Sequence, residues 1–209
     1  MKLKVCGMRD PKNIMEIAGL SPDFMGFIFY KKSKRFVGEE FSVPRGFPDN
    51  IKKVGVFVNE SVEIVLKQVS MHRLDFVQLH GDESAELCGE LKKKTKVIKV
   101  FRIDESFDFN SIREFNSYAD FFLFDTKGDN FGGTGKKFNW DLLKQYDQQI
   151  PFFLSGGLST ENAHEAEKLK SMNLHAIDVN SGVESSPAVK DLKKIKQVQE
   201  ILTSNFFSK

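Results

Sequence analysis

The sequence predicts an α/β fold, a single closed (β/α)8 barrel of the TIM type that takes up residues 1–209. Short β-rich runs alternate with segments of helical spacing along the whole chain, a pattern typical of a parallel sheet. The ends of the eight runs follow one another at steps of 23, 29, 22, 21, 24, 30 and 25 residues. Such regular spacing favours a closed barrel over an open doubly wound sheet and leaves no room for a second domain.

The predicted strands are short and rich in β-branched and aromatic residues. They are LKVC (3–6), FMGFIF (24–29), KVGVFV (53–58), FVQLH (76–80), VIKVF (97–101), DFFLFD (120–125), FFLS (152–155) and AIDVN (176–180). Between them, apolar residues recur at helical spacing. These are Val62, Val65, Leu66 and Val69, then Ala85, Leu87, Cys88 and Leu91, and later Ala163, Ala166 and Leu169.

One unit of the repeat is expected to be irregular. In the segment 31–51, Gly38, Pro44, Gly46 and Pro48 interrupt any helical period, so the second helix should be rudimentary at most. The last segment, 188–202, is rich in lysine and amphipathic, which predicts a surface helix that closes the barrel rather than a nucleic-acid site.

The composition and charge of the chain argue against a nucleic-acid-binding or membrane protein. The net charge is +2, which does not favour a polyanionic partner, and the 21 phenylalanines are enough to fill a large core. No apolar stretch approaches the ~18 residues of a membrane span, and Lys2 and Lys4 interrupt the start of the chain, so no signal peptide is expected. Cys6 and Cys88 are too few and too far apart for a disulfide framework or a metal site. We therefore expect a cytoplasmic protein with free thiols that binds neither nucleic acid nor membrane.

The carboxyl ends of the strands hold the candidate functional residues, because active sites of parallel barrels lie there. These residues are Cys6, His80, Asp125, Ser155 and Asn180. Three of them have an ordinary structural interpretation as well. Cys6 could be a buried packing residue, Asp125 a loop cap and His80 a hydrogen-bonded structural histidine, whereas Cys88 lies in a helical pattern and is assigned to packing.

Two glycine-containing turns predict a phosphate site. SGGL (155–158) follows the seventh strand, and NSGVE (180–184) follows the eighth. Glycine allows the backbone to approach a ligand, and successive N–H groups can bind an anion. Phosphate sites of these barrels often lie after strands seven and eight.

Barrel closure also predicts a buried ion pair. Lys4 lies two residues before Cys6 and should share its inward face, where a lone ammonium would be costly. Closure makes the last strand the neighbour of the first, so we expect Lys4 to pair with Asp178 beneath the site. The Lys4 charge should also favour the Cys6 thiolate.

Eight ordered motifs resemble the phosphoribosylanthranilate isomerase family of tryptophan biosynthesis. They are KVCGMRD (4–10), GFIFYKKSKRF (26–36), VGVFVN (54–59), VQLHGDE (77–83), LFDTK (123–127), GGTGKKFNW (132–140), LSGGL (154–158) and DVNSGVE (178–184). The resemblance runs from the first strand to the last. Lys31 departs from it, because the family often has proline there, and so does the irregular segment after the second strand.

The resemblance implies an Amadori rearrangement of an aminoaldose phosphate to an aminoketose phosphate. This chemistry requires no metal or organic cofactor, and no obligate protein partner is evident from the sequence. The resemblance implies that Cys6 is the general base at C2′ and that Asp125 is the general acid at the ring oxygen. It also implies that Arg35 lies near the anthranilate carboxylate. The remaining predicted substrate-binding residues are His80, Gly156, Gly157, Asp178, Ser181 and Gly182.

The roles of general base and general acid require particular surroundings for Cys6 and Asp125. A thiol base needs electropositive neighbours, and a carboxylic acid needs apolar surroundings, which Phe121, Phe122 and Phe124 could supply. Two rival functions remain. The related isomerase of histidine biosynthesis uses aspartates at both strand ends, so Cys6 argues against it. A phosphate-binding barrel without activity would be expected to have lost its acid or its base.

Overall fold

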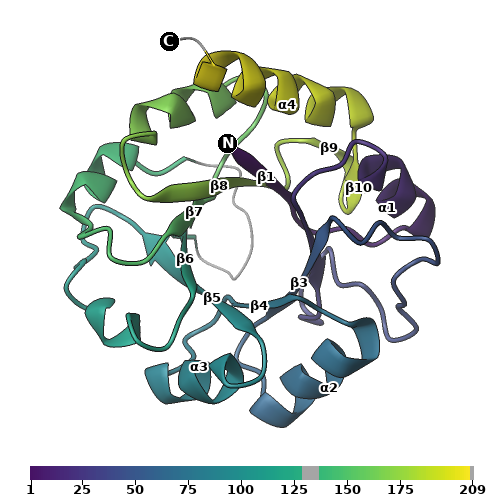
Figure 1. Cartoon of the computed structure of the whole chain (residues 1–209), viewed down its shortest axis with the longest axis horizontal. Helices are drawn as coiled ribbons and strands as arrows, with labels where there is room; N and C mark the ends of the chain where they lie inside the picture. The colour runs from purple at the N-terminus through teal and green to yellow at the C-terminus, as the bar shows by residue number, and fades with distance from the viewer. Residues whose placement is uncertain (129–136, 208–209) are drawn as a thin grey trace.

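Eight parallel strands form a closed barrel in the computed structural model, which describes residues 1–128 and 137–207 (Figure 1). Each strand pairs with the next along the chain, and β8 pairs with β1. The strands are β1 (Lys2–Val5), β2 (Phe24–Ile28), β3 (Lys52–Phe57), β4 (Phe76–Leu79), β5 (Lys96–Ile103), β6 (Phe121–Thr126), β7 (Phe152–Leu154) and β8 (Leu174–Val179). The predicted fold class is therefore confirmed, with strand bounds that differ by at most two residues.

Four α-helices cover the described part of the barrel: α1 (Pro11–Ala18), α2 (Val62–His72), α3 (Ala85–Lys92) and α4 (Leu192–Phe207). The first three begin after side-chain N-caps, Asp10, Ser61 and Ser84, each of which accepts a hydrogen bond from the backbone three residues on. Shorter 3-10 helices follow β5, β6 and β7: η1 (Arg113–Phe115), η2 (Trp140–Gln145) and η3 (Ala163–Leu169). Among the described residues, no helix is both long and apolar enough to cross a membrane.

The predicted helix at Ala163–Leu169 is a 3-10 helix instead of an α-helix. Its flanking residue, Asn162, gives the helix no side-chain cap. The Asn162 amide instead donates to the Gly157 carbonyl at 2.9 Å and accepts from the Ser159 N–H at 2.9 Å. The residue that would cap an α-helix therefore holds the loop after β7 in place.

The expected irregularity after β2 is confirmed, because residues 29–51 form turns and loops with no helix. Aromatic residues of this segment cover the outside of β2 in place of a helix. The Phe41 ring lies 5.2 Å from that of Phe27, and the Phe47 ring lies 6.3 Å from it.

The prediction of a helix from residue 188 is wrong at its start. A two-stranded antiparallel hairpin, β9 (Glu184–Ser186) and β10 (Val189–Lys190), occupies this region, and α4 begins only at Leu192. Ala188 has a φ of 68°, which cannot begin a right-handed helix. Lys190 is fully buried instead of lying on a solvated surface.

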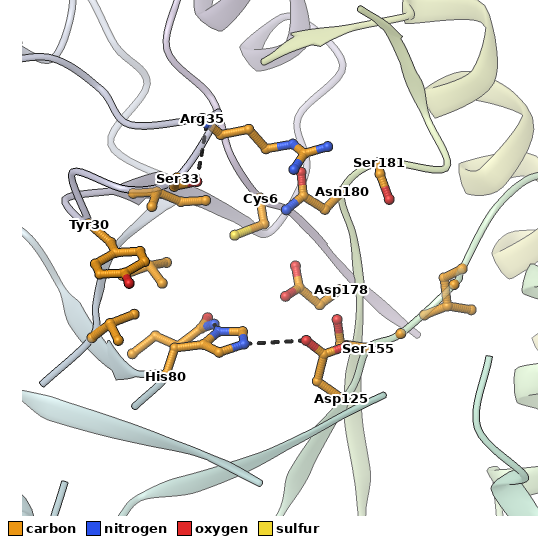
Figure 2. Close-up of a pocket in the computed structure, with 17 residues that line it drawn as sticks. Cys6, Tyr30, Ser33, Arg35, His80, Asp125, Ser155, Asp178, Asn180 and Ser181 are labelled. Atoms are coloured by element: carbon orange, nitrogen blue, oxygen red, sulfur yellow. Dashed lines mark hydrogen bonds and ion pairs between the residues drawn. The ribbon is translucent and has the colours of Figure 1, made fainter. Parts of the chain in front are cut away.

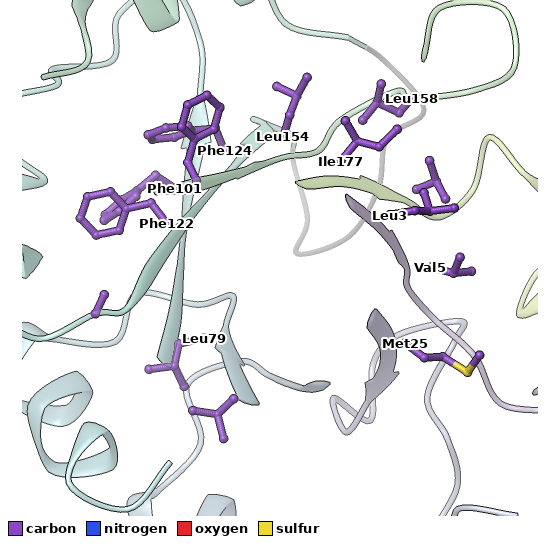
Figure 3. Close-up of a cluster of buried hydrophobic side chains, with 14 of the residues drawn as sticks. Leu3, Val5, Met25, Leu79, Phe101, Phe122, Phe124, Leu154, Leu158 and Ile177 are labelled. Carbon is purple, nitrogen blue, oxygen red and sulfur yellow. The ribbon is translucent and has the colours of Figure 1, made fainter. Parts of the chain in front are cut away.

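The barrel has an outer and an inner apolar layer. The outer layer lies between strands and helices and includes Phe101, Phe122 and Phe124 (Figure 3). The inner layer fills the barrel toward the amino ends of the strands; its members are Phe24, Val54, Phe76, Ile98, Val100, Leu123, Phe153 and Ala176. The His175 ring packs against Phe24, Phe121 and Phe153 at this end. Aromatic side chains fill this end of the barrel, and a cavity lies at the other end.

Candidate active site

A cavity at the carboxyl ends of the strands brings together most of the predicted site residues (Figure 2). Its lining includes Cys6, Arg35, His80, Asp125, Ser155, Gly156, Gly157, Asp178, Asn180 and Ser181. Of the predicted set, only Gly182 lies outside the lining. Tyr30 and Ser33 also line the cavity and were not predicted, although their position just after β2 places them at the same edge of the sheet.

Cys6 follows β1 and its side chain is buried inside the mouth of the barrel. Its N–H donates to the Val179 carbonyl on β8 at 2.9 Å. A Cβ atom at Gly26 on β2 would lie 2.7 Å from the Cys6 sulfur, so glycine is needed there to leave room for the thiol. Burial raises the pKa of the thiol, and the charges of Lys4 and Lys190 lower it only in part. Lys4 thus acts in the expected direction, but burial outweighs it and the pKa stays above the ordinary value.

The predicted ion pair between Lys4 and Asp178 is confirmed. The Lys4 Nζ lies 2.8 Å from the Asp178 Oδ2, and the two side chains are 0% and 4% exposed. Strand register explains the contact, because Lys4 of β1 pairs directly with Asp178 of β8. Burial acts to lower the pKa of Lys4, but the neighbouring Asp178 raises it above the ordinary value, so the ammonium stays charged. The second oxygen of Asp178, Oδ1, accepts no hydrogen bond from the described residues.

Asp125 lies at the end of β6 and faces a histidine. Its Oδ2 is 3.3 Å from the His80 Nε2, and its Oδ1 accepts a hydrogen bond from the Thr126 N–H at 2.8 Å (Figure 2). The His80 Nδ1 is 3.0 Å from the Gln78 amide nitrogen. With that amide nitrogen as donor, a neutral His80 carries its proton on Nε2, facing Asp125.

The expected phenylalanine surroundings of Asp125 are not present. Side chains alternate along β6, so Phe122 and Phe124 point outward into the core beneath the helices. Phe121 points inward but packs with the aromatic cluster at the other end of the barrel. The immediate neighbours of the carboxylate are therefore polar.

Arg35 lines the cavity as expected but is already paired with a residue that was not singled out from the sequence. Its Nε and Nη2 donate to the two oxygens of Glu184, each at 2.7 Å. Glu184 also accepts from the Nζ of buried Lys190 at 2.7 Å. Lys190 lies in the segment predicted to be helix, and Glu184 lies outside that segment, at the end of the motif NSGVE. The sequence therefore offered no signal for this contact beyond the position of Glu184 after the last strand.

The glycine turns after β7 and β8 lie against each other. Gly156 and Gly157 have positive φ values of 88° and 66°. A Cβ atom at Gly182 would overlap the Leu158 carbonyl oxygen, and Ser159 forms an isolated bridge with Gly182. The two turns therefore meet at one side of the cavity, the arrangement that a shared anion site requires.

Residues 132–136, which belong to the motif GGTGKKFNW, lie outside the described part of the chain. Within the described part, no three His, Cys, Asp or Glu side chains are placed to hold a metal ion together.

Residues 3–200 match the family model described as N-(5'phosphoribosyl)anthranilate (PRA) isomerase. The N-(5'-phosphoribosyl)anthranilate isomerase of Parabacteroides distasonis is 44% identical over 208 residues, 97% of this chain and 94% of the relative. The phosphoribosyl anthranilate isomerase of Thermotoga maritima superposes with a TM-score of 0.84 at 33% identity, covering 98% and 99% of the two chains. A phosphoribosyl anthranilate isomerase in complex with reduced 1-(o-carboxyphenylamino)-1-deoxyribulose 5-phosphate superposes with a TM-score of 0.80 at 30% identity, covering 98% and 99%.

Proposed function

The chain belongs to the N-(5'-phosphoribosyl)anthranilate isomerase family of tryptophan biosynthesis, and we propose that it performs this isomerisation with Cys6 as general base and Asp125 as general acid. One observation carries the proposal: the Cys6 thiol and the Asp125 carboxyl line the same cavity from β1 and β6 (Figure 2). An acid and a base on opposite sides of one sugar are what ring opening followed by enolisation requires.

The first step is ring opening. Protonated Asp125 gives its proton to the ribose ring oxygen, the bond from C1′ to that oxygen breaks, and the nitrogen lone pair forms a C1′=N iminium. The proton that Asp125 gives up is replaced from solvent between turnovers, and the Nε2 of His80, 3.3 Å from the Asp125 Oδ2, orients the carboxyl group. His80 is thus a positioning residue for Asp125, and Gln78 holds its ring through Nδ1.

The second step is enolisation. The Cys6 thiolate removes the proton from C2′, the electrons of that C–H bond form a C1′=C2′ double bond, and the iminium electrons return to nitrogen. The enolamine becomes the ketone when the C2′ hydroxyl loses a proton and C1′ gains one, so substrate and product are isomers. Asp178 lines the same cavity, and its Oδ1, which lacks a described partner, can accept a hydrogen bond from a sugar hydroxyl.

The substrate carries two anionic groups, a phosphate and a carboxylate. We assign the phosphate to the backbone N–H groups of the turns at Gly156–Gly157 and Ser181–Gly182, which meet beside the cavity. We assign the carboxylate to Arg35, because a guanidinium matches a carboxylate with two parallel hydrogen bonds. The aromatic ring then lies at the mouth, near Tyr30.

The test is turnover of N-(5'-phosphoribosyl)anthranilate by purified protein and by two variants. Cys6→Ala and Asp125→Asn should each lower kcat about 10²- to 10⁴-fold, the usual contribution of one acid or base. Cys88→Ala is the matched control, because Cys88 lies in α3 away from the cavity, and it should retain wild-type kcat. Near-normal turnover by either folded variant would remove that residue from the mechanism. A wild-type protein that binds the substrate without converting it would favour the inactive phosphate-binding barrel.

A further inference from the structure

The Arg35 guanidinium presents two edges, and the protein uses only one of them. Nε and Nη2 form the edge that is bound to Glu184. Nη1 donates no hydrogen bond to any described residue, and Nη2 has a second N–H beside it. A guanidinium has five N–H donors in a planar fork, so the edge made by Nη1 and Nη2 can bind a second carboxylate while the first stays in place.

Glu184 is itself held firmly behind this edge. Its Oε1 accepts hydrogen bonds from the Lys190 Nζ at 2.7 Å and from the Ala188 N–H at 3.0 Å. Lys190 also donates to the Asn180 Oδ1 at 2.7 Å, and its backbone N–H donates to the Asn13 Oδ1 at 2.8 Å. The Glu184 and Lys190 side chains are 7% and 0% exposed, so solvent does not compete for these contacts.

The arginine stem is confined as well. A Cβ atom at Gly7 would lie 2.7 Å from both the Arg35 Cδ and the Asn180 Oδ1. The stem therefore passes directly over the Gly7 backbone, and the guanidinium lies beside the Asn180 amide at the edge of the cavity (Figure 2). The Gly7 backbone thus confines the arginine stem, and Glu184 binds one edge of the guanidinium.

We propose that Glu184, anchored by Lys190, is a positioning residue that holds Arg35 with its free Nη1/Nη2 edge toward the cavity, so that the enzyme selects substrates whose aromatic ring carries a carboxylate. This inference rests on the proposed assignment of Arg35. The charges fit it, because Arg35, Glu184 and Lys190 together carry one net positive charge to meet one carboxylate. Glu184 keeps the guanidinium from rotating away, and its negative charge offsets the repulsion between the Arg35 and Lys190 cations.

The experiment compares two substrates that differ only in that group, N-(5'-phosphoribosyl)anthranilate and N-(5'-phosphoribosyl)aniline. The ratio of their kcat/KM values measures selection for the carboxylate. Glu184→Gln should lower this ratio roughly 10- to 100-fold, because hydrogen bonds to a charged group contribute on that scale and misplacing the arginine forfeits them. Glu184→Asp keeps the charge but shortens the reach by one methylene, so it should lower the ratio less.

Glu167→Gln is the matched control, because Glu167 forms an exposed ion pair with Lys170 on η3 and should leave the ratio unchanged. Calorimetric binding of reduced 1-(o-carboxyphenylamino)-1-deoxyribulose 5-phosphate and of its decarboxylated analogue should show the same loss of preference. Circular dichroism verifies that each variant is folded.

The outcomes distinguish the role of Glu184 from the assignment of Arg35. A high wild-type ratio that Glu184→Gln leaves intact overturns the role of Glu184 while the assignment of Arg35 stands. Equal losses with both substrates mean that Glu184 supports the fold or the phosphate, which also overturns the inference. A wild-type ratio near one overturns the assignment of Arg35, and a wild type inactive toward both substrates overturns the proposed mechanism.

Discussion

Replacing Lys4 by methionine should destabilise the protein and shift the titration of Cys6. The ammonium that is removed is fully buried and lies 2.8 Å from Asp178. Removing one partner of a buried pair typically costs about 3–5 kcal/mol of unfolding free energy, because the other charge stays buried and unpaired. For a chain of this size each kcal/mol corresponds to about 2–4 °C in Tm, so we expect a decrease of about 6–20 °C.

Two comparisons make this test specific. The double variant Lys4→Met/Asp178→Leu removes both charges and should recover most of the lost stability, because a buried ion pair can often be replaced by apolar residues at little cost. Lys31→Met is the surface control, since Lys31 and Glu39 are 75% and 68% exposed, and it should leave Tm nearly unchanged. A single variant as stable as the wild type, or a double variant no more stable than the single, would refute the reasoning.

The same substitution should act on the thiol. Lys4 lowers the pKa of Cys6 against the larger effect of burial, so its loss should raise that pKa further. Ultraviolet absorbance of the thiolate, followed against pH in a Cys88→Ala background, measures the shift. That background is useful because burial raises the pKa of Cys88 to about 11. An unchanged Cys6 pKa would mean that Lys4 serves the fold alone.

Two further predictions concern phosphate binding and pH. Gly182→Ala would place a Cβ atom against the Leu158 carbonyl and separate the two turns. It should therefore raise KM and weaken competitive inhibition by inorganic phosphate roughly 10- to 100-fold. Unchanged inhibition would contradict the assigned anion site. Burial lowers the pKa of His175 to about 4 from an ordinary 6.5, so the unfolded state binds a proton that the folded state does not, and stability should fall as the pH decreases from about 6.5 toward 4. His175→Gln should flatten this dependence of Tm on pH, and an equal slope in wild type and variant would exclude His175 as its source.

Strands, strand-end residues and barrel closure could be predicted from the sequence because each follows from a periodic or nearest-neighbour rule. The pairing of Lys4 with Asp178 is the clearest example, since it needs only the alternation of side chains and the adjacency of the first and last strands. Cys6 and Asp125 likewise reach one cavity because parallel strands end at the same edge.

The parts that could not be predicted depend on irregular backbone. Lys190 belongs to a lysine-rich segment whose spacing resembles a surface helix. The left-handed backbone of Ala188 places Lys190 in a hairpin instead, where its ammonium is buried. The contact between Arg35 and Glu184 joins two such irregular segments, which no periodic rule relates. The surroundings of Asp125 were misjudged for a different reason, because residues adjacent in a strand face opposite sides of the sheet.

Closure by the last strand has a consequence for the chain as it emerges during synthesis. Without β8, β1 would leave one edge of the sheet unpaired, and such edges readily pair with other chains and aggregate. An inward-pointing lysine is one of the devices that protect natural edges, because a foreign strand docking there would trap its ammonium without a counter-ion. Asp178 of β8 supplies that counter-ion when the barrel closes. The same lysine that lies under the candidate active site would therefore discourage wrong partners for the first strand for as long as β8 is missing.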